Sequence, residues 1–387
     1  MEIVNNLKIT DTAYGGAGVG RSGDGRVIFV QKTVEGDIVN AKIYEDKKSF
    51  ANAHLLEIVS PSDKRIIPEC SYAEKCGGCP FAHIDYKEQL GIKKRIILNQ
   101  LRKYKHSLID ISIAESLREG YRLRATARSI EGSIGFYAQG SRDLIKAGRC
   151  RVIKESLYEK MKKFAYDNHL TGEIYAIEND ENIALANVIS EYINIKNISY
   201  FEGSNINNKK YGISQMNFNT FYGAVPVTYK SFFQANRYLL DEFQKYAISL
   251  VSDHMDIVEL YAGAGFFTCG LMQKGNVQAC ESDQVSSNLG RKLSYNIKTM
   301  DSGKFLQSIK KCDTLFLDPP RDGADKVVIE NIKRIKPYEI IYVSCNPNTL
   351  ARDMIRLQED YKVNEFKLFD MYPDTYHIES VVKLKRI

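Results

Sequence analysis

The stretch "DIVELYAGAGFFTCGLMQKG", residues 256–275, decides the fold of the C-terminal part of the chain. It begins as an apolar strand, turns at its glycines and continues in an amphipathic helical pattern. Three later stretches have the same strand character and end in polar residues: "VQACESD" (277–283), "CDTLFLDPPRDG" (312–323) and "EIIYVSCNPNT" (339–349). Strands that alternate with helices predict a parallel, doubly wound α/β sheet.

The carboxyl ends of these strands predict a ligand site, because ligands of such sheets bind there. Gly263 and Gly265 let a nucleotide-like group approach the backbone. Glu281 ends the second strand, where it can accept hydrogen bonds from ribose hydroxyls. The third glycine of the dinucleotide fingerprint is absent, which argues against NAD. G-x-G, the acid and the later D-P-P at Asp318 together favour S-adenosylmethionine.

Length and composition describe an ordinary globular protein. The 387 residues suffice for two or three domains, and the net charge is +6. No apolar run reaches the roughly 18 residues that a membrane helix needs, so we expect no membrane partner. The N-terminus shows no signal-peptide pattern, and we expect a cytoplasmic protein.

The positive charge is concentrated between residues 118 and 154, where nine Lys or Arg stand against three acids. Within "YRLRATAR", the residues Arg122, Arg124 and Arg128 share one parity, so on a strand they would face one side. A solvated surface is one interpretation. A groove for a polyanion such as RNA is the other, and it makes these arginines candidate RNA-binding residues.

The cysteines form a second pattern. "PECSYAEKCGGCPF" contains Cys70, Cys76 and Cys79 in a C-x5-C-x2-C spacing, and Cys150 is the nearest candidate for a fourth ligand. Disulfides are not expected without a secretory signal. Four thiolates suit either zinc or an iron–sulfur cluster, and a tight triad with one distant cysteine is more typical of a cluster.

The chain divides into three predicted parts. Residues 1–60 contain short β-type runs broken by glycines, which predict a small β-barrel with hairpin turns at Gly15, Gly16, Gly18 and Gly20. Residues 61–225 are a β-rich central domain that carries the cysteine triad, a helical stretch and the basic segment. Residues 226–387 contain the alternating strands and helices.

On these motifs the chain resembles the RNA (uracil-C5)-methyltransferases, most closely the bacterial 23S rRNA branch. "YGGAGVGR" with "DGRVIFV" resembles a TRAM domain, an OB-like RNA-binding barrel, and the four cysteines resemble the [4Fe-4S] site of that branch. "SFFQANRYL", "ELYAGAGFF", "ACESD" and "LDPPRDG" resemble the cofactor segments. The resemblance therefore implies a Rossmann-like domain in which S-adenosylmethionine contacts Gln234, Tyr261, Glu281 and Asp318.

The same resemblance implies the catalytic pair. "VSCNPNTLARD" is similar to the nucleophile motif, in which Cys345 matches the attacking cysteine. "YPDTYHIESVVKL" is similar to the closing motif, in which Glu379 matches the general base. A soft thiolate can add to uracil C6 and activate C5 toward an electrophilic methyl group.

The predicted activity is transfer of a methyl group from S-adenosylmethionine to C5 of an RNA uridine. The resemblance favours 23S rRNA as the partner, free or in early assembly, and a monomeric enzyme. A uridine of the tRNA T-loop is the alternative substrate, and a non-catalytic iron–sulfur RNA-binding protein is a further alternative. An adenine amino-methyltransferase fits less well, since Arg321 follows the prolines where those enzymes carry an aromatic residue.

Overall fold

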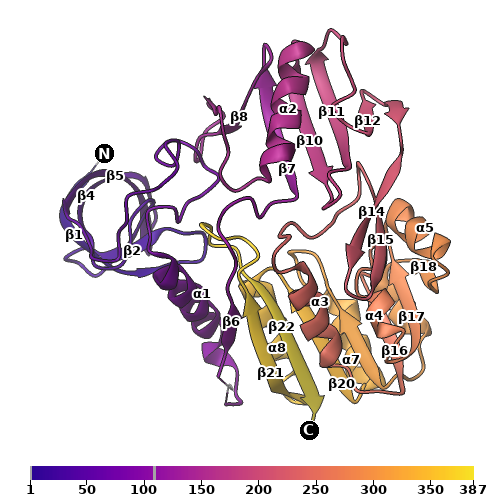
Figure 1. Ribbon diagram of the computed structural model, residues 1–387. Coiled ribbons are helices and arrows are strands. Elements are labelled where there is room, and N and C mark those ends of the chain that lie inside the picture. The colour runs from indigo at the N-terminus through magenta and orange to yellow at the C-terminus, as the bar shows by residue number, and fades with distance from the viewer. Residues whose placement is uncertain (1, 108–109) are drawn as a thin grey trace. The chain divides into compact units, whose positions relative to one another are not determined.

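The computed structural model describes residues 2–107 and 110–387, and the chain forms two compact units (Figure 1). The first comprises Met1–Asn99, Tyr137–Ile145 and Tyr372–His377. The second comprises Gln100–Phe136, Lys146–Met371 and Ile378–Ile387. Among the described residues, no helix is long and apolar enough to cross a membrane.

The first unit contains a closed barrel, which confirms the predicted N-terminal β-barrel. Its strands are β1 (Ile3–Thr12), β2 (Gly18–Arg21), β3 (Val27–Val30), β4 (Ile38–Asp46) and β5 (Phe50–Ser60), in the order β1-β2-β3-β5-β4. Alternate apolar residues, among them Ile9, Ile28 and Ala51, fill the interior. The period-2 alternation that predicted strands is therefore the pattern that builds the barrel core.

Two of the N-terminal glycines have a role that differs from the prediction. Gly15 and Gly16 lie in a turn at positive φ, as expected, whereas Gly18 and Gly20 lie in strand β2. A Cβ on Gly18 would stand 2.0 Å from Thr33 Oγ1, and one on Gly20 would stand 2.7 Å from Leu7. The prediction of hairpin turns is thus wrong for these two, because the barrel interior leaves no room for a side chain there.

The rest of the first unit is built around helix α1 (Tyr86–Gln100). The buried Gln89 side chain donates to Phe81 O (3.1 Å), Ile84 O (3.0 Å) and Asp374 Oδ1 (2.9 Å). These bonds hold residues 372–377, a segment from near the C-terminus, against the helix. A short 3₁₀ helix, η1 (Leu101–Lys103), follows.

The second unit contains a seven-stranded sheet with helix α2 (Glu155–Asp167) and a separate hairpin. The sheet order is β13-β12-β11-β10-β7-β8-β9. These strands are β7 (Arg124–Ile130), β8 (Ser133–Tyr137), β9 (Leu144–Lys146), β10 (Thr171–Glu178), β11 (Ala184–Tyr192), β12 (Gly203–Ile206) and β13 (Lys209–Gly212). The hairpin pairs β14 (Gln215–Thr220) with β15 (Gly223–Thr228).

An eight-stranded sheet forms the other part of the second unit, in the order β18-β17-β16-β19-β20-β22-β21-β6. Its strands are β6 (Ser112–Ala114), β16 (Met255–Leu260), β17 (Gly275–Glu281), β18 (Ile297–Thr299), β19 (Thr314–Leu317), β20 (Glu339–Ser344), β21 (Tyr361–Phe369) and β22 (Glu379–Arg386). Its helices are α3 (Leu240–Ser249), α4 (Thr268–Leu271), α5 (Gln284–Lys292), α6 (Ser302–Ser308), α7 (Lys326–Ile335) and α8 (Pro347–Leu357). Strands β16 to β20 pair in parallel, while β22 is antiparallel to both neighbours.

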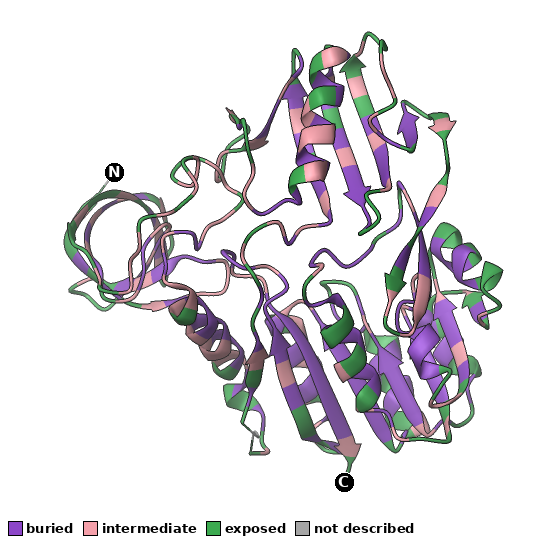
Figure 2. Cartoon of the chain, viewed as in Figure 1, coloured by how far each residue is buried: buried purple, intermediate pink, exposed green. Residues whose placement is uncertain are grey.

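This topology places a switch point at the end of β16. The chain runs from β16 outward to β17 and β18, then returns to β19 on the other side of β16. Crevices at such points are where open α/β sheets bind ligands. The inner strands β19 and β20 are buried throughout (Figure 2), so only their ends can carry chemistry.

Helix α4 is shorter than the sequence pattern predicts, spanning only Thr268–Leu271. Strand β16 ends at Leu260 and strand β17 begins at Gly275, so the glycine loop and the helix share the connection 261–274. The aromatic residues of that connection, Phe266 and Phe267, are buried against other aromatic rings. Their apolar character therefore reflects packing in a tight connection and not the face of a longer helix.

Candidate active site

The strand register brings the two predicted catalytic residues together. Strands β20 and β22 run antiparallel, and their last matched pair is Ser344 with Ser380. Cys345 directly follows Ser344, and Glu379 directly precedes Ser380. One position beyond a matched antiparallel pair, the two residues lie opposite each other. A thiol and a carboxyl that are 34 positions apart in the sequence thus meet at one edge of the sheet.

Cys345 also lies at the start of helix α8. Asn346 is the N-cap, its side chain accepts a hydrogen bond from Asn348 N (3.0 Å), and Pro347 opens the helix. This is the arrangement expected from Pro at the first helical position. The positive end of an eleven-residue helix beside a thiol favours the thiolate.

The charges around this pair oppose ionisation of the thiol. Burial raises the pKa of Cys345 to about 12, the carboxyls of Glu379 and Asp318 add to the rise, and Arg321 lowers it. Burial also raises the pKa of Glu379 well above its ordinary value, with Asp318 adding and Arg321 and Arg124 opposing. The thiol of Cys345 is therefore neutral near neutral pH, and burial disfavours the charged form of Glu379 while Arg321 and Arg124 favour it.

The loop after β16 has a backbone conformation that allows a ligand to come close to the main chain. Tyr261, Gly263 and Gly265 have positive φ values of 62°, 57° and 99°. No atom lies within 4 Å of where a Cβ on Gly263 would stand, so the space beside this glycine is open. Gly263 N donates to Glu281 Oε2 (2.9 Å), which ties the loop to the end of β17. The glycine loop and the acid chosen from the sequence therefore form one contiguous structure.

Of the three other predicted cofactor residues, Tyr261 and Asp318 lie at this edge, directly after strands β16 and β19. Asp318 follows β19 and is partly buried, and burial raises its pKa to about 7. Gln234 is buried, with 7% of its surface exposed. Tyr261 turns its phenol inward, where burial raises its pKa strongly and a hydrogen bond with Ser302 opposes the rise. Tyr261 therefore presents its backbone to the site edge and its hydroxyl to the interior.

Three residues that the sequence interpretation did not assign belong to this region. Glu259 is 1% exposed, accepts a hydrogen bond from Thr268 Oγ1 (2.6 Å), and has a pKa raised to about 8 by burial. Arg321 acts on both Cys345 and Glu379. Phe232 is 64% exposed, and the Arg124 guanidinium lies 4.3 Å from its ring centroid. The sequence held a signal for two of them: Glu259 is an acid inside an apolar strand, and Phe232 is an aromatic residue in "SFFQANRYL".

The predicted RNA-binding arginines do not share one environment. The burial pattern of β7 confirms that Arg124 and Arg128 share one side of the strand. Arg128 Nη2 forms an ion pair with Glu191 (2.5 Å). Arg124 instead stacks over Phe232 and acts electrostatically on Glu379. Arg122 precedes the strand, and its backbone N donates to Val152 O (2.8 Å). RNA binding by the three stays a prediction.

The cysteine triad lies in the first unit, in a loop shaped by glycines. A Cβ on Gly77 would stand 3.1 Å from the Gln139 backbone, and Gly78 N donates to Cys76 Sγ (3.4 Å). Burial raises the pKa of Cys76. Within the described residues no group of three His, Cys, Asp or Glu side chains is arranged to hold a metal ion, and no cysteine forms a disulfide. Cys150 belongs to the second unit, so the four-cysteine site stays a prediction.

Comparisons with known proteins point to one family. The family model described as tRNA (Uracil-5-)-methyltransferase matches residues 292–387, and the TRAM domain model matches residues 4–56. An uncharacterized RNA methyltransferase of Aquifex aeolicus is 27% identical over 98% of both chains. Another, from Synechocystis sp., is 29% identical over 99% of this chain and 96% of its own.

A solved structure supports the fold. The tRNA (uracil-54, C5)-methyltransferase of Pyrococcus abyssi, in complex with S-adenosyl-L-homocysteine, superposes with a TM-score of 0.80. The match covers 98% of this chain and 100% of that chain at 22% sequence identity. At this identity the comparison shows the fold alone, and the two chains share it over nearly their whole lengths.

The matching family model and the relatives together indicate an RNA methyltransferase. Residues 292–387 are thus similar to the tRNA (Uracil-5-)-methyltransferase family, and residues 4–56 are similar to TRAM domains. The predicted enzyme class, an S-adenosylmethionine-dependent RNA methyltransferase, is confirmed at this level.

Proposed function

We propose that this enzyme transfers a methyl group from S-adenosylmethionine to C5 of a uridine in RNA through a covalent bond between Cys345 and C6. The observation that carries the proposal is the register of β20 and β22, which sets Cys345 opposite Glu379 at the switch-point edge of the sheet. An RNA-binding module without catalysis would have no use for a half-buried thiol and a buried carboxyl at that edge.

The residues at this edge fit S-adenosylmethionine. The open space beside Gly263 admits a close ligand, and Gly265, Gln234, Tyr261, Glu281 and Asp318 complete the proposed binding set. When bound, S-adenosylmethionine supplies an electrophilic methyl group on a positively charged sulfur. The remaining steps are the work of the chain's own residues.

Cys345 acts first, because C5 of uracil is a poor nucleophile. Its thiolate adds to C6, and the C5–C6 electron pair moves into an enolate that makes C5 nucleophilic. C5 then forms its bond to the methyl group. Glu379 removes the C5 proton, the released electron pair restores the C5–C6 double bond, and the thiolate leaves. Before the first step the thiol of Cys345 loses its proton to solvent, and before the third the carboxyl of Glu379 does the same. The proton that Glu379 takes from C5 returns to solvent after the thiolate has left.

Two arginines partly offset the burial that opposes both ionisations. The arginines that face Glu379, Arg321 and Arg124, favour its carboxylate, and Arg321 also favours the thiolate of Cys345. The target base must leave its stack to reach a site at the edge of a sheet, which costs a few kcal/mol and favours looped or single-stranded RNA.

We propose 23S rRNA as the substrate, free or in early assembly, with the enzyme acting as a cytoplasmic monomer. The TRAM match and the cysteine motif support this choice, because both accompany the 23S rRNA branch that the sequence resembles. A tRNA T-loop uridine is the second candidate, since the matching family model is described by tRNA and the Pyrococcus abyssi enzyme acts on uracil-54 of tRNA.

We also propose that Cys70, Cys76, Cys79 and Cys150 bind a [4Fe-4S] cluster. The chemistry of the donor set fits: thiolates are the ligands of such clusters, and an N–H donor at Gly78 already faces Cys76 Sγ. No step of methyl transfer requires electron transfer, so the cluster would serve the structure of the protein.

The proposal is tested by mapping 5-methyluridine in total RNA from cells with and without this gene. Loss of the modification from 23S rRNA alone supports the first substrate, and loss from tRNA alone supports the second. Unchanged 5-methyluridine in both RNAs, with purified enzyme inactive on both transcripts, would contradict the proposed activity.

A further inference from the structure

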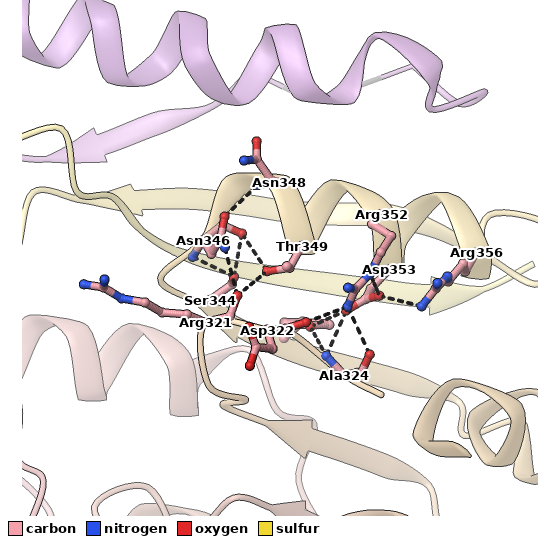
Figure 3. A network of polar contacts seen from close by, with 11 residues as sticks. Arg321, Asp322, Ala324, Ser344, Asn346, Asn348, Thr349, Arg352, Asp353 and Arg356 are labelled. Atoms are coloured by element: carbon pink, nitrogen blue, oxygen red, sulfur yellow. Dashed lines mark hydrogen bonds and ion pairs between the residues drawn. The ribbon is translucent and has the colours of Figure 1, made fainter. Parts of the chain in front are cut away.

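Helix α8 makes a set of contacts that the chemistry of methyl transfer does not explain. Its side chains bind the backbone of the loop 321–324, which connects Asp318-Pro319-Pro320 to helix α7 (Figure 3). Four residues of one helix face take part: Asn346, Thr349, Arg352 and Asp353. They are spaced by three, six and seven positions from the first, which is the spacing of one face of an α-helix.

The first half of the face holds Arg321. Asn346 Nδ2 donates to Arg321 O (2.8 Å), and Thr349 Oγ1 donates to the same oxygen (3.1 Å). Asn346 is the residue directly after Cys345. The backbone of Arg321 is therefore bonded to the chain one position from the proposed nucleophile.

The second half holds the rest of the loop. Arg352 Nη2 donates to Asp322 O (2.8 Å) and Ala324 O (3.1 Å). Ala324 N donates to Asp353 Oδ2 (2.9 Å), which also accepts from the Tyr342 hydroxyl (2.9 Å). Three loop carbonyls and one N–H thus have their partners on a single helix, so the loop has little freedom to move.

Asp353 is the centre of this set of contacts, which we call the α8 clamp. Its carboxylate is fully buried, and Arg352 Nε donates to its second oxygen (2.8 Å). A buried carboxylate with this many donors is held in one orientation. Gly323 shows how close the fit is, because a Cβ there would stand 2.7 Å from both Arg352 Nη2 and Asp353 Oδ2.

The side chain of Arg321 takes no part in the clamp. Its guanidinium extends from the loop on the side opposite Asp353 (Figure 3) and is exposed. Besides burial, the carboxyls of Glu379 and Asp318 raise the pKa of the Cys345 thiol, and the positive charge of Arg321 lowers it. The clamp therefore fixes the backbone that carries the cation of the site.

We propose that the α8 clamp positions Arg321 so that its guanidinium stabilises the Cys345 thiolate, with Asp353 as the central positioning residue. The inference rests on the proposed role of Cys345 as nucleophile. Helix α8 then serves both the nucleophile and its cation. The helix begins just after Cys345, and its side face holds the backbone of Arg321, whose charge stabilises the thiolate.

The test is the reactivity of the thiol, which does not require methyl transfer. The rate of Cys345 alkylation by iodoacetamide would be followed from about pH 7 to pH 10 by mass spectrometry of the peptide that contains it, in the full-length protein. Because an opposite charge near an ionisable group shifts its pKa by about one unit or more, Arg321→Ala should move the profile up by about one unit and slow alkylation about tenfold at pH 8. Arg321→Lys should restore part of the rate.

Two further variants test the clamp itself. Thr349→Val removes one donor to Arg321 O at a partly exposed position and should slow alkylation about two- to threefold while the fold is retained. Asp353→Asn should slow it more, and circular dichroism will show whether that variant folds. Asn348→Ala is the matched control, since Asn348 is an exposed residue of the same helix and its side chain points away from the loop (Figure 3).

Unchanged alkylation profiles in both Arg321→Ala and Thr349→Val would overturn the inference, and so would an equal shift in Asn348→Ala. Failure of the proposed function gives a different result. In that case 5-methyluridine would be absent from the products of the wild-type enzyme while the thiol profiles still shifted.

Discussion

The cysteine triad and Cys345 differ in how far away in the sequence their neighbouring groups lie. Cys70, Cys76 and Cys79 lie within ten residues of one another in a glycine-rich loop, and their grouping is local. Cys345 stands alone in the sequence, and its neighbours in space, Glu379 and Asp318, come from other strands. One short loop can supply several metal ligands. The charged groups around a nucleophile, in contrast, come from distant segments that only strand pairing brings together.

The sharpest test of this difference is Cys345→Ala. Without the thiolate no adduct can form, so methyl transfer to RNA should fall by at least about 10⁴-fold. Transfer would be measured with labelled S-adenosylmethionine. Cys312→Ala is the control, because Cys312 is a buried thiol with no proposed role, and it should keep most of the activity. Substantial transfer by Cys345→Ala would remove this residue from the role of nucleophile.

Glu379→Gln should stall the reaction later. Addition and methylation can proceed, but removal of the C5 proton is prevented, and turnover should fall about 10²- to 10⁴-fold. A protein–RNA complex that survives SDS electrophoresis should accumulate, and it should be absent from the Cys345→Ala, Glu379→Gln double mutant. Near-normal turnover by Glu379→Gln would mean that the carboxyl is not the base.

The local cysteine group has its own test. Protein purified without oxygen should be brown and contain about four irons per chain with matching sulfide. Cys76→Ser should lose most of the iron, whereas Cys312→Ser should keep it, because the latter thiol is not among the predicted ligands. A colourless protein with one zinc per chain would favour a structural zinc site.

The smallest effect is expected from the basic strand. Replacing Arg122, Arg124 and Arg128 together with Ala should reduce the slope of log affinity for RNA against log salt by about 0.7–0.9 for each RNA phosphate that is no longer neutralised. Lys326→Ala with Lys333→Ala, two exposed changes on helix α7, is the control and should leave the slope unchanged. If the triple variant keeps the wild-type slope, these arginines serve the intramolecular contacts of the folded chain and do not bind phosphate.

Much of the site could be predicted because each part lies at the end of a strand with a strong pattern. Gly263, Glu281, Asp318 and Cys345 all follow apolar runs, and parallel strands end at one edge of a sheet. Arg124 could not be placed in this way. Its parity on β7 was predictable, but its position over Phe232 and its action on Glu379 depend on segments more than 100 residues away.

The glycines of the barrel also show that a local pattern does not reveal which distant residues surround a position. A cluster of glycines predicts turns, and Gly15 and Gly16 lie in one. Gly18 and Gly20 are glycines because side chains from Thr33 and Leu7 occupy the interior beside them. No local pattern separates the two pairs, since the difference is the volume that other strands leave.

The sequence by itself determined the order of strands and helices in the C-terminal part, the β-barrel pattern, the cysteine triad and the residues at the strand ends. These follow from periodicity, turn residues and spacing, which act over a few positions. The tertiary structure alone decided that Cys345 faces Glu379, that helix α8 clamps the loop of Arg321, and that burial raises the pKa values of Cys345, Asp318 and Glu379. The reason is physical: burial and charge depend on which distant segments surround a group, and that is settled only when the sheet has formed.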